Sequence, residues 1–82
     1  MKLNNCLKQV RNAHSMTQQE LAETVGVTRQ TVIAVEKGRF RPSVELALLM
    51  SRALDTPLEE IFWLEGEEHP LPEQGQGNGR SE

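Results

Sequence analysis

The sequence has 82 residues, of which 37% are hydrophobic and 26% are charged, and its net charge at pH 7 is −3. This length allows one domain, and this composition excludes a wholly disordered chain and a membrane protein. No apolar run approaches the roughly 18 residues of a membrane span, and no apolar signal segment follows the first residues. Cys6 is the only cysteine, which excludes an intrachain disulfide and a thiolate metal cage. We therefore expect a small cytoplasmic domain with no membrane contact.

The negative charge is concentrated at the C-terminal end. Through Leu64, eight basic residues stand against seven acidic ones, whereas from Glu65 onward one basic residue stands against five acidic ones. Residues 66–82 are rich in glycine and proline and contain Leu71 as their single large apolar side chain, so they bury too little surface to offset the entropy of ordering. The sequence predicts a folded domain over residues 1–65 and a disordered acidic tail over residues 66–82.

Apolar periodicity and capping residues predict the first three helices. A stripe with helical spacing predicts a helix over residues 3–13, ended by His14. The run over residues 17–20 fits a capping box that opens a second helix, which Gly26 ends. A third helix, over residues 28–37, is capped by its first residue. The stripe of the first helix consists of Leu3, Cys6, Leu7 and Val10.

Two further helices are predicted before the tail. Ser43 caps a fourth helix, and a second capping box over residues 56–59, with proline at the first helical position, starts a fifth helix that runs to about Phe62. No repeat is visible, and no stretch alternates long enough to require a sheet. The side of the fourth helix expected to face the core comprises Val44, Ala47, Leu48, Ser51 and Leu54, with Leu46, Leu49 and Met50 widening its apolar surface.

The second and third helices, joined by a short glycine turn, have the arrangement of a helix-turn-helix, whose second helix enters the DNA major groove. At about 100° per residue, the third helix divides into two sides. The inward side comprises Thr31, Val32 and Val35, and the outward side comprises Arg29, Gln30, Ile33, Ala34 and Lys37. The outward side is the surface that DNA would meet.

Two outward residues near the start of this helix suit direct base recognition. Arg29 can donate two hydrogen bonds to guanine O6 and N7, and Gln30 can pair with adenine N6 and N7. Ile33 either contacts a thymine methyl group or is a scattered exposed apolar side chain. The sequence alone leaves these two interpretations of Ile33 open.

Basic residues after the reading helix are expected to hold the DNA backbone. Lys37, Arg39 and Arg41 fall within five residues without an intervening acid. A run of this kind is often only a solvated face, but its position favours salt-dependent phosphate contacts. Gln18 and the first backbone N–H groups of the second helix could also hold a phosphate. Thr31 completes the expected set of phosphate contacts.

Four runs together resemble the Cro/C1-type (XRE) family of helix-turn-helix transcriptional regulators: residues 17–22, 26–32, 36–38 and 42–43. The resemblance covers residues 3–64 and implies an all-α, five-helix, lambda-repressor-like domain. Very short, cytolysin-repressor-like members of this family imply in addition a small antiparallel sheet between residues 2–4 and 63–65. Double-stranded DNA with an inverted repeat is the implied ligand, bound by a homodimer.

The same resemblance implies roles for individual residues. DNA contacts are implied at Gln18, Thr28, Arg29, Gln30 and residues 39–41. With the outward side of the third helix, this gives a base-reading set of Thr28, Arg29, Gln30, Ile33 and Ala34. A structural salt bridge is implied between Arg11 and Glu36, and breaking one side of it should be costly if the pair is buried.

Large apolar residues at the end of the fifth helix support dimerisation independently. Phe62, Trp63 and Leu64 are more than a short helix needs unless something covers them. They cap the core of one chain or they contact a second copy, and we expect a homodimer through this end, with Leu49 contributing. A two-fold dimer would place its reading helices about 34 Å apart, one turn of DNA.

No constellation of catalytic residues is apparent, so we expect no enzyme activity, cofactor, metal or small-molecule ligand. His14 and His69 lie far apart in sequence, and no glycine-rich phosphate loop is present. The alternative to a repressor is an antitoxin-type interaction module that neutralises a partner protein and regulates its own promoter. The acidic tail would then dock a partner, whereas solubility is its other explanation.

Overall fold

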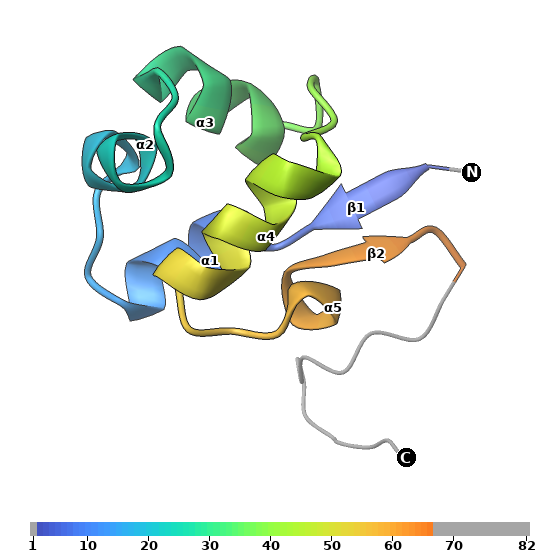
Figure 1. Ribbon diagram of the computed structural model, residues 1–82. Helices are drawn as coiled ribbons and strands as arrows, with labels where there is room; N and C mark the ends of the chain where they lie inside the picture. Colours follow the sequence, from blue (N-terminus) through green and yellow to red (C-terminus); the bar gives the residue numbers. More distant parts are fainter. Residues whose placement is uncertain (1, 67–82) are drawn as a thin grey trace.

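The computed structural model describes residues 2–66. Within this range the elements are β1 (Leu3–Asn5), α1 (Leu7–Ala13), α2 (Gln18–Val25), α3 (Arg29–Glu36), α4 (Val44–Ala53), α5 (Leu58–Ile61) and β2 (Phe62–Leu64). Figure 1 shows the helices packed around one core, with β1 and β2 forming a ribbon at its edge. The predicted tail lies outside the described residues, except for Gly66. No described helix is long and apolar enough to cross a membrane.

The expected helical domain with a small sheet is confirmed, but the predicted start of the first helix is wrong. Residues 3–5 form β1, which pairs antiparallel with β2 in the register Leu3 to Leu64, Asn4 to Trp63 and Asn5 to Phe62. The side chain of Asn5 then separates strand from helix, because its Oδ1 accepts a hydrogen bond from the backbone N–H of Leu7 at 3.0 Å. Apolar spacing could not reveal this boundary, because Leu3 reaches the core from the strand as well.

Capping side chains fix two helix starts as predicted. Thr17 Oγ1 accepts from the backbone N–H of Glu20 at 3.0 Å, and Glu20 Oε1 accepts from the backbone N–H of Thr17 at 2.8 Å, which completes the capping box of α2. Ser43 Oγ caps α4 by accepting from the backbone N–H of Leu46 at 3.0 Å. These bonds satisfy N–H groups that have no partner inside a helix.

The second predicted capping box is absent, and α5 is shorter than predicted. Thr56 Oγ1 donates to the carbonyl of Leu54 at 2.7 Å instead of accepting from the helix, so α5 begins after Pro57 without a side-chain cap. The backbone of Phe62 is extended, with φ −126° and ψ 141°, and opens β2. Pairing with β1 therefore decides where this helix ends.

The core-facing side of α4 also differs from the prediction. Val44 is 75% exposed and Leu48 is 48% exposed. The helix is apolar around most of its circumference, so the pattern could not choose between two sides, and packing against α2 and α5 decides. The α4 segment buries Leu46, Ala47, Met50 and Leu54.

Cys6 joins the start of α1 to the end of α5, as a buried core residue. Its backbone N–H donates to the carbonyl of Ile61 at 2.9 Å, and its Sγ donates to the carbonyl of Glu60 at 3.1 Å. Burial raises the pKa of the Cys6 thiol to about 11, because a thiolate is poorly solvated there. The thiol therefore acts as a hydrogen-bond donor and packing group.

This burial predicts slow thiol chemistry. At pH 8 the folded chain should hold about a hundredfold less thiolate than a thiol with the ordinary pKa of 9.0, so Cys6 should react with a disulfide reagent far more slowly when folded than in urea. Because folding raises the pKa of Cys6, the neutral thiol is favoured in the folded chain over the thiolate. Its contribution to the free energy of unfolding is present below pH 9 and is lost as the pH rises toward 11. Equal reaction rates for the folded and unfolded chains would contradict the burial.

Candidate nucleic-acid interface

A three-residue turn sets α3 across α2. Gly26 has φ 82°, and its backbone N–H donates to the carbonyl of Ala22 at 2.9 Å. A β-carbon at Gly26 would meet nothing within 4 Å, so the left-handed backbone and not lack of space favours glycine there. Val27 packs against the core, and Thr28 Oγ1 caps α3 by accepting from the backbone N–H of Thr31 at 3.3 Å. The turn fixes the direction in which α3 leaves α2.

The two sides of α3 are those predicted from the helical angle. Val32 and Val35 are fully buried, whereas Arg29 and Gln30 are exposed at the N-terminal end. Thr31, Ile33 and Ala34 are half-buried, so the aliphatic group of Ile33 is only partly accessible. Because the inward valines lock its rotation, α3 can present the same outward groups each time it meets a ligand.

A buried ion pair ties α1 to the end of α3. Arg11 Nε lies 2.6 Å from Glu36 Oε2, and the two side chains are only 8% and 5% exposed. Arg11 Nη1 also donates to the carbonyl of Met16 at 2.8 Å, which holds the segment that enters α2. The structure thus contains the salt bridge that the family resemblance implies. Arg11 connects α1, the end of α3 and the segment that enters α2.

The same carboxylate begins a chain of hydrogen bonds that ends on Arg29 of α3. Gln18 Nε2 donates to Glu36 Oε1 at 3.1 Å, and Arg29 Nε donates to Gln18 Oε1 at 3.3 Å. Gln18 therefore holds Arg29, a positioning role that the sequence did not reveal because the three residues are far apart in the chain. The second hydrogen of Gln18 Nε2 could still donate to a phosphate, so that contact stays a prediction.

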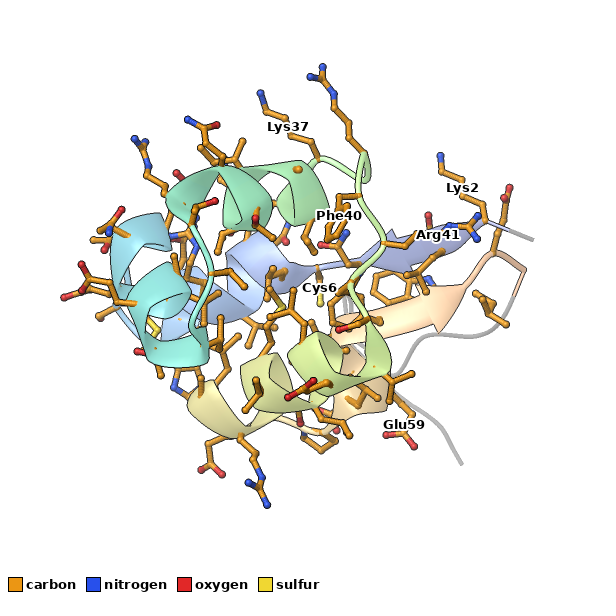
Figure 2. All side chains as sticks on the ribbon, turned by 45° about the horizontal axis from the view of Figure 1, so that its top comes forward. Lys2, Cys6, Lys37, Phe40, Arg41 and Glu59 are labelled. Carbon is orange, nitrogen blue, oxygen red and sulfur yellow. The ribbon has the colours of Figure 1, made fainter. Side chains whose placement is uncertain are left out.

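Exposed cations follow α3 as predicted. Lys37 and Arg39 are exposed at its C-terminal end, and Arg41 is exposed two residues further on. Figure 2 shows Lys37 and Arg41 on one side of the molecule, with Glu59 on the other. Phe40, half exposed between the two arginines, is an aromatic side chain to which the sequence interpretation assigned no role.

Lys2 is a cation that the sequence interpretation missed. It is exposed and precedes β1, and its carbonyl accepts from the backbone N–H of Glu65 at 2.7 Å. In Figure 2 it lies on the same side as Lys37 and Arg41. The helix predicted over residues 3–13 gave no reason to place it there, whereas the strand pairing implied by the family resemblance and present in the structure does. The positive side of the molecule therefore includes the N-terminal strand.

The four residues predicted at a dimer interface occupy different settings. Phe62 is 8% exposed and packs in the core of its own chain, which is one of the two alternatives that the sequence left open for it, and its dimer contact stays a prediction. Trp63 is half-buried and Leu64 is 38% exposed on β2. Leu49 instead lines a groove beside the turn between α2 and α3. Leu49 lies on α4, whereas the other three residues lie on β2.

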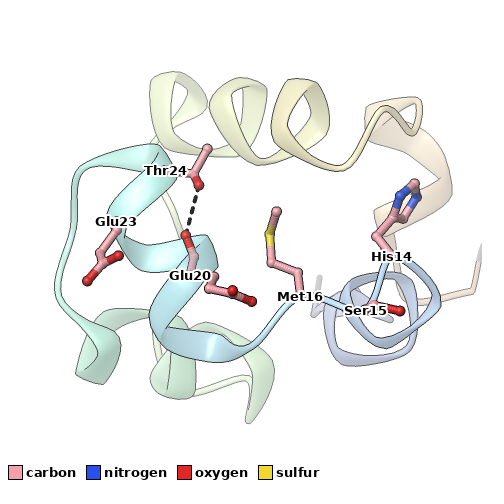
Figure 3. Close-up of a pocket in the computed structure, with 6 residues that line it drawn as sticks. All are labelled: His14, Ser15, Met16, Glu20, Glu23 and Thr24. Atoms are coloured by element: carbon pink, nitrogen blue, oxygen red, sulfur yellow. Dashed lines mark hydrogen bonds between the residues drawn. The ribbon is translucent and has the colours of Figure 1, made fainter.

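A shallow pocket between the end of α1 and the outer side of α2 has no catalytic arrangement among the described residues. Figure 3 shows its lining side chains, and the carboxylate of Glu20 is already engaged in the capping box. Thr24 Oγ1 donates to the carbonyl of Glu20 at 2.8 Å within the same helix. No group of three potential metal ligands occurs within residues 2–66. The lining residues are His14, Ser15, Met16, Glu20, Glu23 and Thr24.

The capped helix α3 is held across α2 by a tight turn and a buried ion pair, and exposed cations follow its end. This arrangement is that of a helix-turn-helix transcriptional regulator of the Cro/C1 type. The family model described as helix-turn-helix matches residues 7–61, and the chain belongs to this family. The predicted family is thereby confirmed.

Similar proteins carry names of the same class. YgzD, an uncharacterized HTH-type transcriptional regulator of Bacillus subtilis, is 48% identical over 65 residues, which cover 79% of this chain and 98% of YgzD. An uncharacterized HTH-type transcriptional regulator of Methanothermobacter thermautotrophicus is 52% identical over 60 residues, which cover 72% of this chain and 87% of that protein. These similarities extend over most of each protein.

Two solved structures share the fold. The clp gene regulator ClgR from Corynebacterium glutamicum has a TM-score of 0.62 and 31% identity, covering 63% of this chain and 55% of ClgR. The restriction-modification controller protein C.AhdI from Aeromonas hydrophila has a TM-score of 0.61 and 33% identity, covering 63% of this chain and 79% of C.AhdI. Their agreement confirms the helical architecture around the turn.

The buried ion pair yields a stability prediction. Glu36→Ala leaves the Arg11 guanidinium buried without its carboxylate, and we expect the free energy of unfolding in urea to fall by about 3–5 kcal/mol. Glu23→Ala, at an exposed carboxylate, should change it by about 0.5 kcal/mol or less. The double change Arg11→Met with Glu36→Leu removes both charges and should be less destabilising than Glu36→Ala alone. A decrease below about 1 kcal/mol for Glu36→Ala would contradict the structural role.

Proposed function

We propose that this chain is a sequence-specific repressor that binds an inverted-repeat operator in double-stranded DNA as a homodimer, with α3 in the major groove. The observation that carries the proposal is the division of α3 into a fully buried side and a polar outward side that begins with Arg29 and Gln30. A helix locked by buried valines supports base recognition, because its outward groups keep a fixed position relative to the bases.

Base recognition is assigned to one side of α3. The Nε of Arg29 is bonded to Gln18, which leaves its terminal N–H groups for guanine O6 and N7. Gln30 is exposed one residue further on and can pair with adenine. The complete base-reading set is Thr28, Arg29, Gln30, Ile33 and Ala34.

Phosphate contacts are assigned to the two ends of the motif. The exposed cations after α3 supply the charge, and the N-terminal end of α2 supplies free backbone N–H groups. Such contacts set affinity and register but carry no sequence information. This set comprises Gln18, Thr31, Lys37, Arg39 and Arg41.

A homodimer would present two α3 helices to the DNA, and so would bind an operator with two half-sites. Two-fold symmetry would place two α3 helices about 34 Å apart on one face of DNA, which requires a nearly palindromic site. Trp63 and Leu64 on β2 are the proposed contact residues, whereas Leu49, which the sequence grouped with them, lies on α4. A dimer seated on a promoter would exclude polymerase, which is the simplest way for such a domain to repress. The structurally similar ClgR is a clp gene regulator and C.AhdI is a restriction-modification controller protein, and both favour a regulatory role.

Selection of bound sequences from a random duplex library tests base recognition. We expect the wild-type chain to enrich a palindrome with half-sites one turn apart, and Arg29→Ala and Gln30→Ala each to relax preference at defined positions, at a cost of about 1–3 kcal/mol per base contact. Failure of the wild type to enrich any sequence would overturn sequence-specific binding. Enrichment of a single half-site would retain base recognition and overturn the dimer.

The salt dependence of operator binding tests the proposed phosphate-binding residues. Arg39→Ala should weaken binding to all sequences alike and reduce the slope of log affinity against log salt by about 0.9 for each phosphate that the variant no longer neutralises. Lys8→Ala, at an exposed cation on α1, is the matched control and should leave the slope unchanged. An unchanged slope for Arg39→Ala would remove this residue from the phosphate-binding set.

A further inference from the structure

The outer side of α4 carries an apolar patch. Val44, Leu48 and Leu49 are 75%, 48% and 36% exposed, and they are three of the five most exposed large apolar side chains within residues 2–66. They line one shallow groove together with Glu45 and Arg52. The opposite side of the same helix packs in the core, so the patch is additional to the apolar surface that folding requires.

Two opposite charges frame this patch symmetrically. Glu45 and Arg52 are seven residues apart, which places them on nearly the same line along the helix and about 10 Å apart. That separation is too long for a salt bridge within the helix, and neither side chain takes part in an ion pair within the described part of the chain. The midpoint between them falls between Leu48 and Leu49.

This pattern is complementary to itself. When two identical helices pack antiparallel about a two-fold axis through that midpoint, each Glu45 meets Arg52 of the partner subunit, and the leucines of both copies meet at the centre. A partner of another sequence would have no reason to match both the spacing and the signs. We propose that the outer side of α4 is a self-association surface whose occupant is the same surface of a second copy of this chain.

The position of α4 leaves the DNA-binding side free. In Figure 2, Lys37 at the end of α3 lies at the top of the molecule, and α4 runs along the lower side. Association through α4 therefore adds to the operator-binding dimer proposed through β2, and it would connect DNA-bound units. The inference concerns protein contacts alone and can be tested without DNA, so its failure would leave base recognition untouched.

Charge reversal in the full chain tests the proposal by sedimentation equilibrium without DNA. Glu45→Arg and Arg52→Glu each create two like-charge contacts per pair, and we expect each variant to weaken association about tenfold or more and to halve the mass seen for the wild type. The double change Glu45→Arg with Arg52→Glu restores opposite charges and should restore the wild-type mass. An equimolar mixture of the two single variants should do the same, because an all-basic side then meets an all-acidic one.

Controls separate charge from position. Glu23→Arg on α2 and Lys8→Glu on α1 make the same changes in net charge at exposed sites and should leave the mass unchanged. Circular dichroism shows whether each variant keeps its helices. A wild-type chain that is monomeric at all concentrations, single variants with unchanged mass, or a mixture that fails to associate would each overturn the proposal.

Discussion

The buried pair of Arg11 and Glu36 is the interaction on which the rest of the structure depends. A guanidinium and a carboxylate that are almost fully removed from water stabilise each other only while both are present and correctly placed. Because Arg11 lies on α1 and Glu36 ends α3, their contact fixes the position of α3 relative to the core. Gln18 carries the same constraint to Arg29, so one ion pair governs both packing and the outward surface.

Local chemistry decided the features that could be predicted from the sequence. Thr17, Thr28 and Ser43 cap their helices in the structure because each hydroxyl accepts from the backbone N–H three residues further along the chain. The side of α3 that faces the core could also be predicted, because Val32 and Val35 lie three residues apart on one side of the helix and are buried together. Within the motif, propensity, capping and apolar pattern all favour the same structure.

Features that depend on distant partners could not be derived from periodicity. Val44 faces solvent although its neighbours suggested the core, because α4 is apolar on most sides and the positions of α2 and α5 select one of them. β1 lies within an apolar helical spacing, and only the presence of β2 at the other end of the domain makes it a strand. The role of Gln18 could not be derived for the same reason, because its partners Glu36 and Arg29 lie on another helix.

The pairing of β1 with β2 joins the first and the last elements of the described residues. Leu3 meets Leu64, so closing this contact costs the entropy of a loop that includes nearly the whole domain, whereas α2 and α3 meet across a turn of three residues. The helix-turn-helix is thus assembled from contacts that are local in sequence, whereas the two strands pair across nearly the whole length of the domain. During synthesis, β1 cannot pair with β2 until residue 64 has left the ribosome, so the helix-turn-helix is available to fold before the two strands can close the domain.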